Sequence, residues 1–226
     1  TAEVTAALVT ANSLVVAPSS RAKLSNAPTV AEVNAIAAKC DSVKASITDA
    51  AATLDDLTTS NSRDSLTLTI NDTAASSVAA TVLSAVGNKT KSVATVSNAI
   101  VITGTTAQLT AALVTDSTLV VAATALGTIS DTGGTALNAT ALSAIGAKTS
   151  GAVTVSDSVV ISGDIDEVNA ALITNASKVV AATAKVTISG TPTIAQVNAV
   201  AGVAGAVTAT IANGNYATQN TLTTNS

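Results

Sequence analysis

Short stretches of the chain alternate between apolar and polar residues, which is the pattern of half-buried β-strands. In residues 65–70 every second residue is Leu or Ile and the others are Ser or Thr, and residues 152–156 and 185–190 alternate similarly. Successive side chains of a strand point to opposite faces. These stretches are therefore predicted to be strands with one buried side and one side in solvent.

A change to helical spacing separates the predicted strands. In residues 193–203, Ile194, Val197 and Val200 fall on one side of a helix, and residues 206–211 return to alternation. The unit is therefore predicted to be strand, short helix, strand. Equivalent helical faces are centred on Val4, Val33, Leu109, Val168 and Val197.

The sequence repeats itself at two nested intervals. Residues 160–184 match residues 101–125 at one constant offset, whereas Val168 and Val197, which are also equivalent, are separated by about half of that offset. The 59-residue interval is therefore a double period of two unequal units. Units of about 22–30 residues are in the size range of solenoid coils.

These patterns predict an α/β repeat solenoid of strand–short helix–strand units, with parallel sheets and with helices along one flank. Residues 1–211 are expected to form a single array. Residues 212–226 break the repeat, and we expect them to be a C-terminal cap, a linker or the start of a further unit. The one aromatic residue of the chain, Tyr216, lies in this last segment.

Four helix starts carry Thr or Asp three residues before Glu or Gln. The pairs are Thr29 with Glu32, Thr105 with Gln108, Asp164 with Glu167, and Thr193 with Gln196. This spacing predicts capping boxes, in which the two side chains satisfy backbone N–H groups at the start of the helix. These acidic and polar residues are thus explained by helix stability, without any catalytic chemistry.

Asn recurs at one position of the predicted helices, as Asn34, Asn169 and Asn198. Amides stacked in successive coils are able to form a hydrogen-bonded ladder. The alternative is an exposed Asn that its helix merely tolerates. The pattern does not decide between them.

Composition narrows the classes of function. The 226 residues include no His, Met, Trp or Phe, so the core must be made of Ala, Val, Leu and Ile. The net charge of −4, with 11 % charged residues, argues against a basic patch for nucleic acid or a polybasic membrane surface. Apolar runs such as residues 199–207 are far shorter than the roughly 18 residues of a membrane span, so no membrane insertion is expected.

Catalytic motifs are not apparent in the sequence. Without histidine the usual nucleophilic triad is excluded, and no feature marks a Ser–Lys pair. Gly133 and Gly134 lack the spacing and the lysine of a phosphate-binding loop, and are expected in a turn. The only cysteine, Cys40, excludes an internal disulfide and is expected to be a small buried residue. We therefore predict that the chain is not an enzyme.

Calcium is the one cofactor for which the sequence contains candidate ligands, and the indication is weak. Asp157, Asp164 and Asp166 lie close together, and calcium prefers carboxylate oxygens in turns. However, the repeat lacks the Gly- and Asp-rich nonapeptide of calcium-binding β-rolls, and Asp164 already has a capping role. Alternating threonines such as Thr67 and Thr69 are typical of ice-binding faces, but the equivalent positions in other strands are too irregular.

The start of the chain suggests a piece of something larger. The first residue is Thr1 and no Met occurs anywhere, so we expect a processed product or a segment of a longer protein. Glu3 aligns with Gln108, so the cap equivalent to Thr105 would precede Thr1. The expected partners are neighbouring repeats of a longer chain or further copies of this one.

The repeats at residues 66–90, 101–115 and 188–202 resemble the Ala/Thr/Val-rich arrays of giant bacterial cell-surface proteins, especially those of marine cyanobacteria. The resemblance implies an extracellular or cell-surface location and a structural role, and it carries over no functional residue. We predict a structural module whose stacked repeats form a rod, fibre or surface layer. The alternative is a calcium-dependent adhesin, or a solenoid surface that binds ice or glycans.

Overall fold

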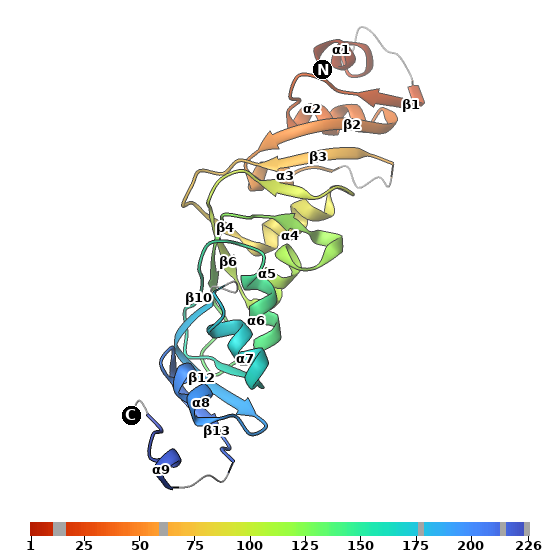
Figure 1. The fold of residues 1–226 in the computed structure, drawn as a ribbon. Coiled ribbons are helices and arrows are strands. Elements are labelled where there is room, and N and C mark those ends of the chain that lie inside the picture. Colours follow the sequence, from red (N-terminus) through yellow and green to blue (C-terminus); the bar gives the residue numbers. More distant parts are fainter. Residues whose placement is uncertain (11–16, 59–62, 176–178, 213–215, 224–226) are drawn as a thin grey trace. The chain divides into compact units, whose positions relative to one another are not determined.

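The computed structural model describes residues 1–10, 17–58, 63–175, 179–212 and 216–223. The chain is of the α/β class, with parallel sheets and flanking helices (Figure 1). Its contacts group into two compact units, Thr1–Ile100 with Ala111–Ala122, and Val101–Thr110 with Ala123–Ser226. Each unit is described separately.

The first unit is built around a five-stranded sheet in the order β1-β2-β3-β5-β7, and the pairings between its neighbours are parallel. Its elements are α1 (Ala2–Leu8), β1 (Ala17–Lys23), α2 (Val30–Ala37), β2 (Cys40–Asp49), α3 (Ala51–Asp55), β3 (Ser65–Ile70), β4 (Ser77–Ala79), α4 (Ala80–Asn88), β5 (Ala94–Val96), the 3-10 turn Asp116–Thr118 and β7 (Val120–Val121).

Strands of this sheet pair at a nearly constant sequence interval. Ala22 is in register with Val43, and Lys44 with Ser65, so these two steps cover equal lengths of sequence. The step is slightly longer between β3 and β5, where Thr69 is opposite Thr95. The β5–β7 pairing keeps the longer step.

The second unit contains two parallel ladders that share one long strand. β12 is 11 residues long; its first residues pair with β10, and residues Lys185 to Ser189 pair with β11. Strand order is β6-β8-β10-β12-β11-β9, and β13 also pairs with β12. The elements are β6 (Val101–Gly104), α5 (Thr106–Leu113), β8 (Leu126–Ile129), β9 (Ala136–Asn138), α6 (Ala139–Gly146), β10 (Val153–Val155), β11 (Val160–Asp164), α7 (Ile165–Leu172), β12 (Val179–Ser189), α8 (Ile194–Ala201), β13 (Ala204–Ala209) and α9 (Tyr216–Gln219).

The pairing interval is similar in this unit. Val153 lies opposite Gly127 and Val179, which are equally far before and after it in the sequence. Val160 lies opposite Ala136 and Lys185, again at nearly equal sequence distances. Both ladders of the second unit therefore advance by about the same length of chain from strand to strand.

The core is aliphatic, as the composition requires. Helices α2 and α8 each bury one apolar face, which includes Val33 and Ile36 in α2 and Val197 and Val200 in α8. These faces pack on neighbouring strands, since α2 contacts β2 and α8 contacts β13. Each small side chain removes only a little apolar area from water, so many thin layers must add up to offset the entropy lost on folding.

The strand predictions agree with the structure with small shifts. Residues 65–70 are β3, and residues 152–156 contain β10. The strand expected at 185–190 begins earlier, at Val179, because alanines fit on either face and hide the alternation. Helix α8 lies within the predicted helical stretch 193–203. None of the described helices is long and apolar enough to cross a membrane.

Candidate functional site

The predicted cap residues occupy helix starts and bind backbone groups. In α2, the Thr29 N–H donates to Glu32 Oε2 at 2.9 Å, and Thr29 Oγ1 accepts from the Glu32 N–H at 3.3 Å. Thr193 and Gln196 make the same two bonds at the start of α8, at the same two distances. Both helices therefore have complete capping boxes.

The other two predicted pairs behave in the same way. The Thr105 N–H donates to Gln108 Oε1 at 2.9 Å and Thr105 Oγ1 accepts in return from the Gln108 N–H. Asp164 Oδ1 accepts from two backbone N–H groups of α7, those of Asp166 and Glu167, both at 2.9 Å. These side chains are engaged in holding helix ends.

One cap was not predicted. Asn138 precedes α6 directly, and its Oδ1 accepts from the Thr140 N–H at 2.9 Å. An Asn immediately before an apolar helical run is a recognised N-cap signal, although no Glu or Gln follows at the third position. The pairing of Thr or Asp with Glu or Gln therefore does not indicate this cap.

Two of the three repeated Asn residues act as clamps to the chain's next segment. Asn34 Nδ2 donates to the carbonyl of Asp56, and Asn34 Oδ1 accepts from the Thr58 N–H, both at 2.9 Å. Asn198 binds the carbonyl of Thr221 and the N–H of Thr223 in the same way, again at 2.9 Å. These bonds run from an amide to the backbone of another segment, which differs from both a ladder of amides and an idle exposed Asn.

Carboxylates bridge segments similarly. Asp72 Oδ2 accepts from the Ala51 N–H at 2.7 Å, and Asp131 Oδ2 accepts from the Thr106 N–H and hydroxyl at 2.7 Å. Asp64 is buried, and its Oδ1 accepts from the Val43 N–H at 2.7 Å. Acidic side chains outside the caps thus also stabilise backbone.

The weak calcium candidates are not gathered into a metal site. Asp164 caps α7, and Asp166 lies in the first turn of that helix, while Asp157 lies between β10 and β11. Among the described residues, no group of three or more His, Cys, Asp or Glu side chains is arranged to hold a metal ion.

Cys40 is partly buried at the start of β2. Its thiol donates to the carbonyl oxygen of Ile36, with Sγ 3.2 Å from that oxygen. Burial raises the pKa of the Cys40 thiol, and hydrogen bonds with the backbone oppose the shift. A protonated, partly covered thiol is a poor nucleophile.

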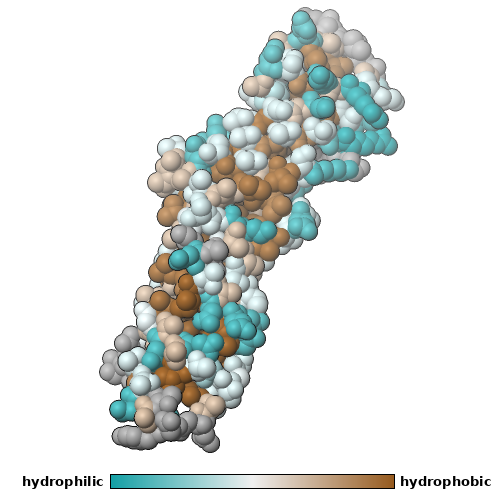
Figure 2. Space-filling model, viewed as in Figure 1, coloured by the Kyte–Doolittle hydropathy of each residue, from teal (hydrophilic) through white to brown (hydrophobic). Residues whose placement is uncertain are grey.

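A groove with basic walls lies on the solvent-facing side of the strands β1 to β3. It has a volume of about 380 Å3 and is called the basic groove below. Its lining residues are Arg21, Ala22, Lys23, Ser42, Val43, Lys44, Arg63 and Ser65. Figure 2 shows hydrophilic residues gathered over this N-terminal part of the first unit.

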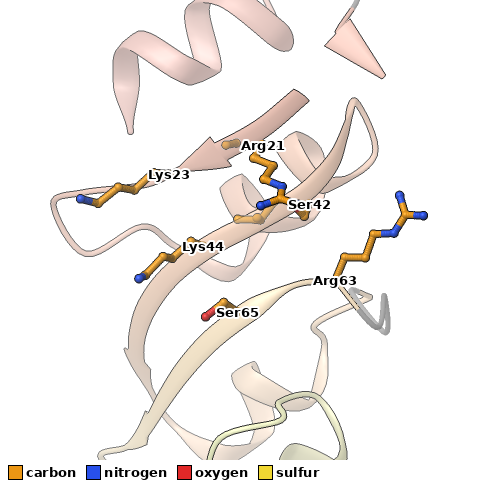
Figure 3. A pocket seen from close by; sticks show the side chains of 8 residues that line it. Arg21, Lys23, Ser42, Lys44, Arg63 and Ser65 are labelled. Atoms are coloured by element: carbon orange, nitrogen blue, oxygen red, sulfur yellow. The ribbon is translucent and has the colours of Figure 1, made fainter. Parts of the chain in front are cut away.

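Sheet register explains why three of the basic side chains lie on adjacent strands, whereas Figure 3 shows the fourth, Arg63, pointing away from Lys23 and Lys44. Lys23 lies directly opposite Lys44, and Arg21 lies opposite Ser42. Figure 3 shows the Lys23 and Lys44 side chains extending in the same direction from adjacent strands, while Arg21 reaches across β2. Arg63 precedes β3 and pairs with Asp41.

The basic groove collects four of the ten Lys and Arg residues of the chain. None of the lining residues in the described part of the chain is acidic. The expectation that a net charge of −4 leaves no basic patch does not hold locally, because a whole-chain sum says nothing about how charges are distributed. The expectation that nucleic acid is not a partner is a separate matter and stays a prediction.

A second hollow, of about 300 Å3, lies in the second unit beside α8 and β13. Its described walls are mostly small aliphatic residues, including Val197, Val207, Ile211 and Leu222, and none of the described lining residues is charged.

Comparisons with protein-family models, with curated proteins and with solved structures find no match to this chain. Only the residues that line the basic groove therefore indicate what it binds. Its described lining carries cations and hydroxyls, a combination suited to binding an anion.

Proposed function

We propose that the chain is a structural α/β solenoid module of an extracellular or cell-surface protein, in which stacked repeats build a rod, fibre or surface layer. The observation that carries this proposal is the pairing interval. In both units, strands pair in parallel with partners that lie about one repeat unit away in the sequence. This interval is expected of a solenoid, in which the chain comes back to the same sheet once per repeat unit and adds one strand beside the previous one.

Side-chain bonds across the same interval support the proposal. Asn34 reaches a carbonyl 22 residues ahead, and Asp131 reaches an N–H 25 residues behind. The hydroxyls of Ser97 and Ser156 donate to carbonyls 27 residues behind them, in the first and second unit respectively. Each segment is thus tied to its predecessor and successor, as in a stack held by nearest-neighbour contacts.

A structural role also agrees with where the polar side chains act. Most of the Asp, Glu, Gln and Asn side chains described above bind helix ends or neighbouring backbone, which is a stabilising role. The chain has no histidine for acid–base work. Together with the resemblance to surface-protein repeats, this favours a module whose function lies in length and stiffness.

Removing one coil tests the repeat architecture. Val160 and Lys185 are register partners, so deletion of residues 160–184 places Lys185 where Val160 was and keeps the ladder in phase. We expect the shortened chain to unfold cooperatively at a lower temperature, with unchanged circular dichroism per residue. A matched control, deletion of residues 160–172, removes half a coil and should abolish the cooperative transition.

The two deletions can also contradict the proposal. If loss of residues 160–184 unfolds the chain as completely as loss of residues 160–172, the units are not interchangeable and the solenoid proposal is wrong.

Assembly is tested separately, on the purified chain. A solenoid whose terminal coils lack a cover has an apolar cross-section and unpaired strand edges that favour end-to-end association. We expect sedimentation velocity to show concentration-dependent oligomers, and negative-stain electron microscopy to show rods. Isolated particles at every concentration would mean that this chain does not build a fibre by itself.

A further inference from the structure

We propose that the basic groove binds the sulfate or carboxylate groups of an acidic polysaccharide. This is a ligand site on the outer face of the sheet, and it does not depend on whether or how the chain assembles.

The first argument is the direct opposition of Lys23 and Lys44. Neighbouring strands are about 4.8 Å apart, and like charges that face each other across strands are destabilising. An anionic group placed between the two ammonium groups would remove this repulsion. The fold therefore holds two cations where stability alone does not favour them, which is expected of residues that serve a ligand.

The second argument is the charge balance of the groove. Among the described residues, the lining of the groove takes part in one ion pair, which joins Arg63 to Asp41. Lys23, Lys44 and Arg21 are exposed, and the remaining lining residues are small and uncharged. A second carboxylate, Asp64, lies next to the lining, where it accepts a hydrogen bond from the Val43 N–H. Four cations beside these two carboxylates, Asp41 and Asp64, leave the groove with a positive balance on a chain with net negative charge.

The third argument concerns what surrounds the cations. Ser42 and Ser65 carry hydroxyls at the register positions of Arg21 and Lys44, and Ala22 and Val43 complete the lining. A volume of about 380 Å3 is near the lower end of the range for ligand pockets and admits a small part of a sugar chain. The exposed Ser65 hydroxyl suits sugar hydroxyls, and the cations suit the acidic substituents.

Nucleic acid and membranes fit this groove less well. Duplex DNA carries one charge per roughly 1.7 Å of its length. It would be repelled by the rest of the chain, whose formal charge is −4 − 4 = −8 when the four cations of the groove are left out. The chain has a single aromatic residue, so it has almost no means of stacking on bases. The lining also lacks the large apolar side chains that enter a lipid interface. An acidic polysaccharide can be bound through its charges and hydroxyls, without aromatic stacking or an apolar anchor.

The test is binding of the full chain to immobilised dextran sulfate and to immobilised polygalacturonate in 50 mM NaCl at pH 7, with neutral dextran as reference. The two anionic surfaces distinguish sulfate from carboxylate. We expect binding to at least one of them, weakening as NaCl is raised to 300 mM. The double variant Lys23→Gln/Lys44→Gln should bind at least tenfold more weakly.

Lys185 supplies a matched control. It is an exposed lysine on β12, and its register partners are Val160 and Ala206, so no cation lies opposite it. Lys185→Gln removes one positive charge and should change affinity less than twofold. Circular dichroism melting should show that Lys44→Gln is at least as stable as the original chain, since it relieves the lysine repulsion.

Three results would overturn the proposal. The first is absence of binding to both anionic polysaccharides at low salt. The second is an equal loss of affinity in Lys185→Gln and in the double variant. The third is tighter binding to a 20-base-pair DNA duplex, or to phosphatidylserine vesicles, with the same dependence on Lys23 and Lys44, which would assign the groove to another class of partner.

Discussion

The β1–β2–β3 ladder of the first unit and the β11–β12–β13 ladder of the second unit share an inner design and differ on the outside. Each leads into helices with capping boxes, and α2 and α8 have nearly the same sequence, VAEVNAIA and IAQVNAVA. Both helices also carry an Asn that clamps a later segment. The inner positions of both ladders are aliphatic.

The outer positions are chemically unlike. The first ladder presents Arg21, Lys23 and Lys44, whereas β12 presents Lys185 with Val160 and Ala206 beside it. Alternation of side chains explains how this is possible, because one face of a strand can change without disturbing the other. The two ladders thus combine a shared aliphatic inner side with outer sides of different charge.

Truncation of a core side chain should have the largest effect on the free energy of unfolding, and the size of this effect should differ between the two ladders. Ile47 is buried opposite Leu68, whereas Ile188 is buried opposite Gly163 and Ala209. Ile47→Ala should lower the free energy of unfolding by about 2–5 kcal/mol. Ile188→Ala should cost less, because its small neighbours leave less contact to lose. Chemical denaturation measures both.

The outward neighbour Ser46 is the control for this pair. Ser46→Ala changes an exposed side chain of the same strand and should alter the free energy of unfolding by less than about 0.5 kcal/mol. Equal losses for Ile47→Ala and Ser46→Ala would contradict the assigned faces of β2.

The Asn clamps should rank next and should be equal in the two units. Asn34→Ala and Asn198→Ala each remove two hydrogen bonds, and each should lower the free energy of unfolding by about 1–3 kcal/mol. Asn34→Asp keeps the acceptor for the Thr58 N–H and loses the donor to Asp56, so an intermediate loss is expected. If Asn198→Ala left the free energy of unfolding unchanged, the second clamp would contribute nothing to stability.

The capping boxes should contribute less to the free energy of unfolding than the Asn clamps do, and the contribution should be the same in both units. Thr29→Ala and Thr193→Ala should each cost about 1 kcal/mol in the free energy of unfolding. Glu32→Gln gives α2 the cap of α8 and should cost only a few tenths of a kcal/mol, from the loss of a carboxylate near the helix N-terminus. A loss after Glu32→Gln as large as after Thr29→Ala would mean that charge, not the paired hydrogen bonds, stabilises this helix.

The raised pKa of the Cys40 thiol in β2 predicts that the free energy of unfolding depends on pH in the alkaline range. The second ladder contains no cysteine and should not add to this effect. Because burial raises the pKa of Cys40 in the folded state, the folded chain holds this proton to higher pH than the unfolded chain. Its contribution to stability is therefore complete below the unfolded thiol pKa of about 8.5 and falls as pH rises through the folded pKa. The difference in unfolding free energy between the original chain and Cys40→Ala, measured from pH 7 to pH 10, should change only in the alkaline range.

Calcium should have the smallest effect. Asp164 is engaged in capping, and its neighbours Asp157 and Asp166 complete no metal site among the described residues. Addition of 5 mM calcium should leave the melting temperature unchanged. A rise of several degrees, abolished by Asp157→Asn, would instead favour a calcium-dependent adhesin.

Much of the local structure was predictable from the chain itself. Alternation located β3 and β10, helical spacing located α8, and the pairing of Thr29 with Glu32 located the start of α2. These are short-range effects, since a strand face or a helix cap depends on residues two to four positions apart. The sequence therefore determines the order of strand and helix, the aliphatic inner face and the capped helix starts.

The tertiary structure decided which distant residues meet. The constant register step between β1, β2 and β3 places Lys23 opposite Lys44, and a shift by one position would put these lysines among the core positions. The repeats alone indicated units of about 22–30 residues, too imprecise to choose a register. Register depends on the packing of whole strands and helices against one another, because only the pairing that buries all apolar faces together removes enough area from water. The basic groove and the Asn clamps follow from that choice.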